Sequence, residues 1–215
     1  YGGVYNDIGH MYLKPLHKFI SENETLIVCK DQGLQNMPPY YIINSIIASV
    51  PGHSMIKKAI DVVIENIRNR FYGNSALEPT GPGAFGKAFN IHFGRKEDEN
   101  VEVGVFNNET KVINQPGHFI EDTNGTRLIK TKFDNYYEIV YPNGKDKDYY
   151  SVLWDQRNIY LGWSGFHTPV LLCIVFVFSV SLPGSYSWLI KVNTESAIFF
   201  TDSAVSYTHL RAHET

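Results

Sequence analysis

Apolar residues in the first fifty positions form short runs separated by glycine, proline or polar residues. These runs predict strands at residues 4–8 and 26–29, and residues 11–16 are expected to continue extended as far as Pro15. Residues 40–50 are rich in β-branched side chains and fit either a strand or a short helix. This part of the chain therefore predicts extended segments, with one element left open.

The clearest helix covers residues 55–70. Pro51 and Gly52 break the preceding segment, Ser54 is the expected N-cap residue, and His53 at the helix start suits a capping or surface role better than an anion contact. Aliphatic residues recur at helical spacing and predict a face packed on the core: Ile56, Ile60, Val63, Ile64 and Ile67. This stripe indicates packing rather than cofactor binding.

The second half of the chain alternates between turns and short elements. Residues 79–83 read as a rigid turn that leads into a helix at 84–90, and Asn107-Asn108 is a turn signal between strands at 101–106 and 111–113. Residues 117–121 form another short apolar segment. Mixed strands and helices with short connections make α/β the expected fold class.

Composition narrows the class of protein. The chain has 215 residues, of which 43% are hydrophobic, 14% aromatic and only 19% charged, so one domain with a real core is expected. The net charge is −3 and lysine and arginine are scattered, so no nucleic-acid partner is predicted. Cys29 and Cys173 lack partners at metal-binding spacing and are interpreted as structural thiols.

Both ends of the sequence look abnormal. The chain opens on Tyr1 inside a motif, which suggests a truncated start. Residues 205–215 resemble a translated sequencing adapter, so we expect them to carry no fold information. Residues 163–204 form a doubtful apolar tail with three readings: a frameshifted segment, a buried strand or helix, or a membrane segment. Native sequence is expected to cover residues 1–162.

The candidate chemistry lies at the start of the chain, in Gly2-Gly3-Val4-Tyr5-Asn6-Asp7-Ile8-Gly9. Glycines permit close approach of the backbone, and a carboxylate at a strand end can hold a hard divalent cation. Such a cation neutralises the negative charge that develops when a nucleoside diphosphate leaves a sugar. A second aspartate two residues after the first would share its face of the strand.

This segment resembles the Gly-Gly-aliphatic-Tyr-x-Asp-x-Asp signature of the DXD-containing glycosyltransferases. That family includes fungal initiating mannosyltransferases, inositol-phosphoceramide mannosyltransferases, and many bacterial and viral capsule-type enzymes. Further segments resemble it in order: residues 44–49 followed by Pro51-Gly52-His53, then Thr80-Gly81-Pro82, then residues 128–160. The resemblance covers about residues 1–160.

The resemblance implies an incomplete GT-A fold, of which residues 1–162 form the C-terminal part, and hexosyl transfer with retention of configuration. It implies a UDP- or GDP-sugar donor, a glycan or lipid-linked acceptor, and Mn²⁺ or Mg²⁺. Asp7 matches the first aspartate, as catalytic residue and metal ligand, whereas Gly9 replaces the second. His10 and His118 are further metal candidates. The expected donor-binding residues are Gly2, Gly3, Tyr5, Asp7, Thr80 and Gly81.

Several of these roles keep alternatives. Tyr5 also fits core packing, Thr80-Gly81 also fits a plain tight turn, and His118 also fits a solvated loop residue. Gly9 leaves open a degenerate, non-catalytic relative that binds sugar nucleotides or glycans. A membrane-associated structural fragment is a third reading, resting on the apolar tail. We expect the parent protein to be an enzyme and this chain alone not to turn over. Its expected location is the Golgi or ER lumen if it is eukaryotic, and the cytoplasm or a membrane surface if it is bacterial or viral.

Overall fold

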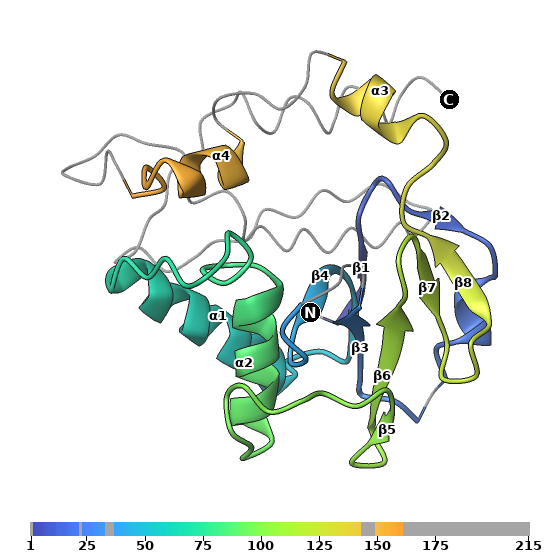
Figure 1. The fold of residues 1–215 in the computed structure, drawn as a ribbon. Helices are drawn as coiled ribbons and strands as arrows, with labels where there is room; N and C mark the ends of the chain where they lie inside the picture. Colours follow the sequence, from blue (N-terminus) through green and yellow to red (C-terminus); the bar gives the residue numbers. More distant parts are fainter. Residues whose placement is uncertain (1, 22, 33–36, 143–148, 161–215) are drawn as a thin grey trace, which may run out of the picture.

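A curled, mixed sheet of eight strands forms the centre of the computed structural model (Figure 1). The structure describes residues 2–21, 23–32, 37–142 and 149–160. The predictions for 163–204 and 205–215 lie outside them, as does Cys173. None of the helices in the described ranges is long and apolar enough to cross a bilayer.

The order and direction of the strands determine which strand ends lie on the same edge of the sheet. The sheet runs β1 (Gly3–Asn6), β4 (Ile42–Ser49), β3 (Leu26–Asp31), β6 (Thr110–Gln115), β7 (Phe119–Glu121), β8 (Arg127–Lys130) and β2 (Met11–Tyr12), and β5 (Gly104–Phe106) also pairs with β6. Only the β3–β6 pair is parallel among these strands. Strands β1, β3, β6 and β8 therefore point the same way, and their ends share one edge, called the carboxyl edge below.

Alternation along β3 divides the core into two clusters. Leu26 and Val28 belong to one buried cluster, and Ile27 and Cys29 belong to the other. Successive side chains of a strand point to opposite faces, so both faces of the sheet are covered and all four residues 26–29 are apolar. The strand predicted at 26–29 is confirmed and continues to Asp31. Cys29 is a buried free thiol, as expected for a structural cysteine.

The segment left open at residues 40–50 is a strand, β4. It pairs with β1 on one side and β3 on the other, so its β-branched residues are held in ladders from both sides. The hairpin predicted at Asn107-Asn108 is confirmed, because β5 and β6 pair antiparallel around these residues. Both asparagines have positive φ, 57° and 59°, a region that asparagine tolerates better than most residues.

Two helices, α1 (Ser54–Arg68) and α2 (Pro82–His92), pack on one face of the sheet (Figure 1). The predicted stripe on α1 is wrong in part, because Ile60 and Ile64 are exposed. The buried face consists of Met55, Ala59 and Val63, at i, i+4 and i+8. The helix is turned so that a small alanine, rather than an isoleucine, faces the core beside α2, which permits close packing.

The start of α1 also differs from the prediction. His53, not Ser54, is the N-cap residue, and its Nδ1 accepts the backbone N–H of Met55 at 3.2 Å. The capping role expected for His53 is confirmed, whereas the cap expected of Ser54 is wrong. Neutral imidazole can serve as an acceptor in the way that serine or asparagine usually does.

Residues 11–16 are less extended than predicted, since β2 has only two residues and the 3₁₀ helix η1 (Leu16–Lys18) begins directly after Pro15. Two short helices follow the sheet, α3 (Tyr136–Val140) and α4 (Tyr150–Asp155). Trp154 Nε1 donates to the carbonyl of Tyr72 at 2.6 Å, and the Tyr160 hydroxyl donates to that of Phe71 at 2.6 Å. These bonds tie α4 and its exit to the end of α1.

Candidate metal and donor site

The loop Asp7–His10 joins two strands that lie at opposite ends of the sheet order, β1 and β2. Curling of the sheet brings the end of β1 and the start of β2 within reach of a four-residue connection. The backbone N–H of Asp7 donates to the carbonyl of Ser45 on β4 at 2.9 Å, and that of His10 donates to the carbonyl of Asp7 at 3.1 Å. The loop is thus a hydrogen-bonded turn on the carboxyl edge.

Asp7 directly follows β1, as expected of a strand-end aspartate. The Tyr5 hydroxyl donates to its Oδ1 at 2.8 Å, and this is the side-chain partner that Asp7 has among the described residues. Burial raises the pKa of Asp7, against the opposing effect of the Tyr5 hydrogen bond. The carboxylate is therefore oriented by one donor and half-buried, with lone pairs left for a ligand.

His10 is held in one tautomer by Asn6. The Asn6 amide nitrogen donates to the Asp7 carbonyl at 2.9 Å, which turns the amide oxygen toward His10 Nδ1 at 2.7 Å. Because that oxygen can only accept, Nδ1 carries the proton and Nε2 keeps its lone pair. Burial lowers the pKa of His10 to about 4, so the ring is neutral at pH 7. A neutral imidazole with its other nitrogen hydrogen-bonded has the form of a metal ligand.

Gly9 is buried under an aromatic ring from the far end of the sheet. A Cβ atom on Gly9 would lie 2.8 Å from Cε2 of Tyr136, the first residue of α3. Burial raises the pKa of Tyr136, and Tyr141 and the negative charge of Asp7 raise it further. The space that a second aspartate would need is therefore filled by Tyr136.

Gly2 and Gly3 lie at positions where the backbone requires glycine. A Cβ atom on Gly2 would lie 2.5 Å from the backbone nitrogen of Pro51 and 2.7 Å from the carbonyl oxygen of Ser49. Gly3 has φ of 137°, a conformation that favours glycine. Close approach to the end of β4 accounts for Gly2, and the positive φ accounts for Gly3.

Thr80 and Gly81 lie at the start of α2, and Gly81 is its N-cap residue. The first turn has few amides to offer an anion, since Pro82 has no N–H, the Gly83 N–H donates to Leu77 and the Phe85 N–H donates to Gly81. The Thr80-Gly81 turn is near the carboxyl edge, because a Cβ on Gly83 would lie 3.2 Å from the Tyr41 ring, just before β4. It is not hydrogen-bonded to the Asp7 loop among the described residues.

Glu78, just before this turn, is buried, and its carboxylate oxygens accept several hydrogen bonds. It accepts hydrogen bonds from the hydroxyl groups of Tyr41 at 3.1 Å and Tyr40 at 3.5 Å, and from the backbone N–H of Asn74 at 3.1 Å. Burial and the Glu78 carboxylate raise the pKa of Tyr41 to about 12, against the Ser75 hydrogen bond. These groups form a structural network that joins the start of β4 to the α1–α2 connection.

His118 and Asp31 also lie near the carboxyl edge, after β6 and at the end of β3. His118 is exposed, and its backbone carbonyl accepts both the N–H and the hydroxyl of Thr131, at 2.9 and 3.1 Å. Among the described residues, no three His, Cys, Asp or Glu side chains converge on a common metal position. His118 therefore does not complete a three-residue metal site with Asp7 and His10.

Three relevant residues were not identified from sequence: Asn6, Tyr136 and Glu78. Tyr136 is more than a hundred positions from Gly9, and no local pattern connects them. Asn6 occupies the variable position of the motif, so the motif does not predict its hydrogen bond to His10. That bond forms because the turn brings the two side chains together. Comparison of the chain with protein-family models, with curated proteins and with solved structures found no significant match.

Proposed function

We propose that the parent protein is a glycosyltransferase that moves a hexosyl group from a nucleoside-diphosphate sugar to a glycan or lipid-linked acceptor. The observation that carries this proposal is the state of Asp7: a half-buried, strand-end carboxylate with a single side-chain donor, Tyr5, and no ion pair among the described residues. The shared direction of β1, β3, β6 and β8 supports the finer assignment to a GT-A-type fold.

Asp7 and His10 are the two residues that fit a divalent cation, Mn²⁺ or Mg²⁺. Both lie on one turn, one offers carboxylate oxygens, and the other offers an unprotonated Nε2. Two protein ligands are enough where diphosphate oxygens and waters supply the others, as is common for Mg²⁺ in phosphate-transfer sites. When bound, the cation would neutralise the charge that develops on the departing diphosphate.

The chain's own residues would position this chemistry. Tyr5 holds the Asp7 carboxylate, Asn6 keeps the lone pair of His10 on Nε2, and the Tyr136 ring packs against Gly9. The acceptor hydroxyl would attack the sugar on the face from which the diphosphate departs, giving retention. Tyr5 and Asn6 are thus positioning residues rather than catalytic ones.

A second candidate function is a non-catalytic relative that binds sugar nucleotides or glycans. The observation in its favour is the contact of Gly9 with Tyr136, because the ring excludes a second carboxylate from the position that the family signature gives to an aspartate. A site with one carboxylate holds a divalent cation less tightly, and weak cation binding suits recognition better than transfer.

Mn²⁺ binding tests the proposal without requiring turnover by this chain. Free Mn²⁺, followed by electron paramagnetic resonance, is expected to fall when the protein is added with UDP-glucose or GDP-mannose. Asp7→Asn should weaken this binding at least about tenfold, the loss typical of a disturbed metal site. The matched control is Asp98→Asn, since Asp98 is exposed on the loop after α2.

Equal Mn²⁺ binding by Asp7→Asn and the parent chain would overturn the assignment of Asp7. A second variant, Gly9→Asp combined with Tyr136→Ala, distinguishes the two candidate functions. It supplies the missing carboxylate and the space for it. A large gain in donor-dependent Mn²⁺ affinity favours the degenerate relative. Donor hydrolysis by the unmodified chain favours the transferase and would overturn the expectation that this chain alone does not turn over.

A further inference from the structure

Residues 11–18 form an exposed segment at the periphery of the sheet. All eight are exposed, and the apolar members Met11, Tyr12, Leu13 and Leu16 keep between 38% and 43% of their surface in solvent. Scattered single apolar residues are normal on a protein surface, but four within six positions are not. The segment therefore presents an apolar surface that the rest of the described chain does not cover.

Hydrogen bonds nevertheless hold the backbone of residues 13–18. The N–H groups of Leu13 and Lys14 donate to the Leu128 carbonyl at 2.8 and 3.2 Å, and the N–H of Lys18 donates to the Pro15 carbonyl at 3.0 Å. Phe19, directly after η1, is buried in the second core cluster. The side chains of Leu13 and Leu16 are therefore exposed on a hydrogen-bonded backbone rather than on a frayed strand.

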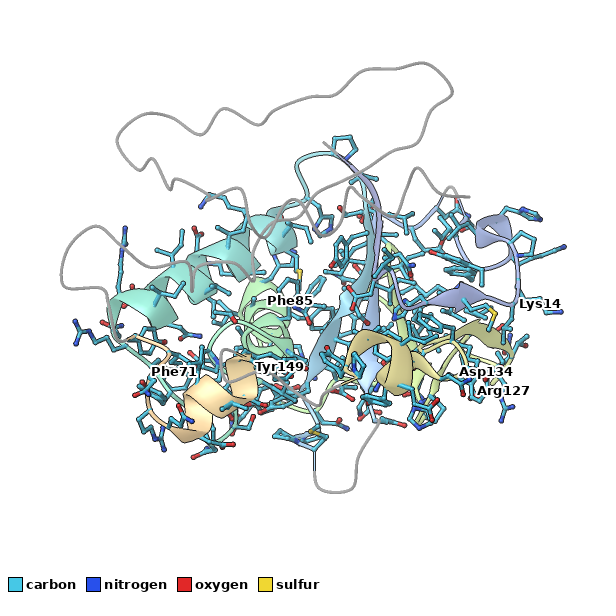
Figure 2. All side chains as sticks on the ribbon, turned by 90° about the horizontal axis from the view of Figure 1, so that it is seen from above. Lys14, Phe71, Phe85, Arg127, Asp134 and Tyr149 are labelled. Carbon is cyan, nitrogen blue, oxygen red and sulfur yellow. The ribbon has the colours of Figure 1, made fainter. Side chains whose placement is uncertain are left out.

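Basic residues alternate with these apolar ones. Lys14, His17 and Lys18 are exposed, and residues 8–20 contain no aspartate or glutamate. Neither Lys14 nor Lys18 has an ion pair with a described residue, whereas nearby Lys130 pairs with Asp134 and Arg127 pairs with Glu121. Lys14 projects outward on the same side of the molecule as Arg127 and Asp134 (Figure 2). The surface thus combines apolar side chains with unpaired positive charge.

We propose that residues 11–18 dock the protein on an anionic lipid surface. Aromatic and aliphatic side chains enter the headgroup region, and lysines beside them attract anionic lipids by about 1 kcal/mol each. Tyrosine, with an apolar body and a polar tip, is suited to this interface. The docking surface begins directly after His10, but it does not depend on the function proposed for Asp7.

A second copy of the chain fits this surface less well. The exposed side of β2 is a sheet edge, which could pair with another strand, but β2 has only two residues and is followed by Lys14 and Pro15. Charge and proline directly after an edge strand oppose edge-to-edge pairing. Unpaired lysines on two copies would also repel each other, whereas anionic lipid attracts them.

Vesicle co-sedimentation of the full chain tests the proposal. The protein is expected to bind phosphatidylcholine vesicles that contain phosphatidylserine more strongly than pure phosphatidylcholine vesicles, and to lose this preference at high salt. Lys14→Glu combined with Lys18→Glu should lower the partition coefficient at least about tenfold. Leu13→Ser combined with Leu16→Ser should lower binding to both vesicle types, with an unchanged thermal midpoint.

The control is Lys57→Glu combined with Lys96→Glu, which changes net charge equally at exposed sites on α1 and on the loop after α2. All variants carry the complete chain, so any contribution of residues 161–215 is common to them. The proposal is overturned if the unmodified chain ignores phosphatidylserine, or if the control variant loses as much binding as the Lys14/Lys18 variant. It is also overturned if sedimentation shows a dimer that the Leu13/Leu16 variant dissociates.

Discussion

Glu78 and Asp7 are two carboxylates in sheltered places, and their surroundings differ in kind. Glu78 is 4% exposed and accepts from two tyrosine hydroxyls and one backbone N–H, so its oxygens are used inside the protein. Asp7 is half-buried and accepts from Tyr5 alone among the described residues. A satisfied carboxylate of the first kind joins elements of the fold, and one of the second kind keeps capacity for a ligand.

This contrast shows why burial alone is a poor guide to function. Sequence reasoning singled out the Thr80-Gly81 turn beside Glu78 as a donor contact, yet the strongest interactions there are internal. The Asp7 loop has weaker internal bonding and two side chains, Asp7 and His10, whose lone pairs remain in part unused. The number of hydrogen bonds that a carboxylate already accepts within the protein is a better guide to its function than its burial.

The largest expected effect is on stability, at Glu78. Glu78→Ala removes the acceptor of three donors, and each unsatisfied buried donor costs about 1–3 kcal/mol. We expect the free energy of unfolding in urea to fall by about 3–5 kcal/mol. Glu97→Ala, at an exposed side chain, is the control and should change it by less than about 0.5 kcal/mol.

Asp7→Asn provides the other half of this test. The asparagine oxygen can still accept from Tyr5, and removal of a half-buried charge costs little, so stability should stay within about 1 kcal/mol of the parent. The contrast between the two carboxylates breaks down if Asp7→Asn destabilises the protein as strongly as Glu78→Ala.

A smaller effect is expected at Gly9. Gly9→Ala places a Cβ atom 2.8 Å from Tyr136 Cε2, so the ring must move, and overpacking of this kind costs about 1–3 kcal/mol. Tyr136→Ala should relieve that cost, so a double-mutant cycle on thermal or urea unfolding should give a favourable coupling free energy. Additive effects of the two substitutions would show that α3 does not pack on the loop in solution.

A further expected effect is the pH dependence that His10 contributes to stability. Its pKa is lowered from the ordinary value of 6.5 to about 4, so between these pH values the unfolded chain binds more protons than the folded protein. Stability from this group is complete above pH 6.5 and is lost as the pH falls toward 4. Urea unfolding at several pH values should show a shallower decline in His10→Gln.

Asp7 contributes with the opposite sign. Its pKa is raised, so the folded protein holds its proton to higher pH, and stability from this group is lost as the pH rises through the folded pKa. Asp7→Asn should therefore steepen the decline in stability toward acid pH, and His10→Gln should flatten it. Changes in the same direction would contradict the environments described for the two side chains.

Local patterns in the sequence were sufficient to predict several secondary-structure elements. The buried run at β3, the asparagine turn between β5 and β6, and the approximate position of α1 each depend on nearby residues, and each was predicted. The orientation of α1 was not, because the isoleucine stripe and the methionine–alanine–valine stripe both recur at helical spacing and are offset by one residue, about 100° around the helix axis. Packing against α2, which lies later in the chain, decides between them.

The site was predictable to a similar degree. The position of Asp7 at the end of a strand followed from its motif, whereas the contact of Gly9 with Tyr136 depends on the curl of the sheet. The tautomer of His10 depends on the orientation of the Asn6 amide, which a sequence pattern does not encode. Contacts between distant strands explain what sequence reasoning missed.

The two-residue pairing of β2 with β8 has a consequence for motion at the candidate site. Met11 and Tyr12 have one neighbouring strand among the described residues, so their amides are expected to exchange with solvent through brief local opening, well below the free energy of global unfolding. The Asp7 loop is thus anchored firmly through β1 and loosely through β2. A ligand that bridges Asp7 and His10 would slow amide exchange on β2, although it touches neither Met11 nor Tyr12.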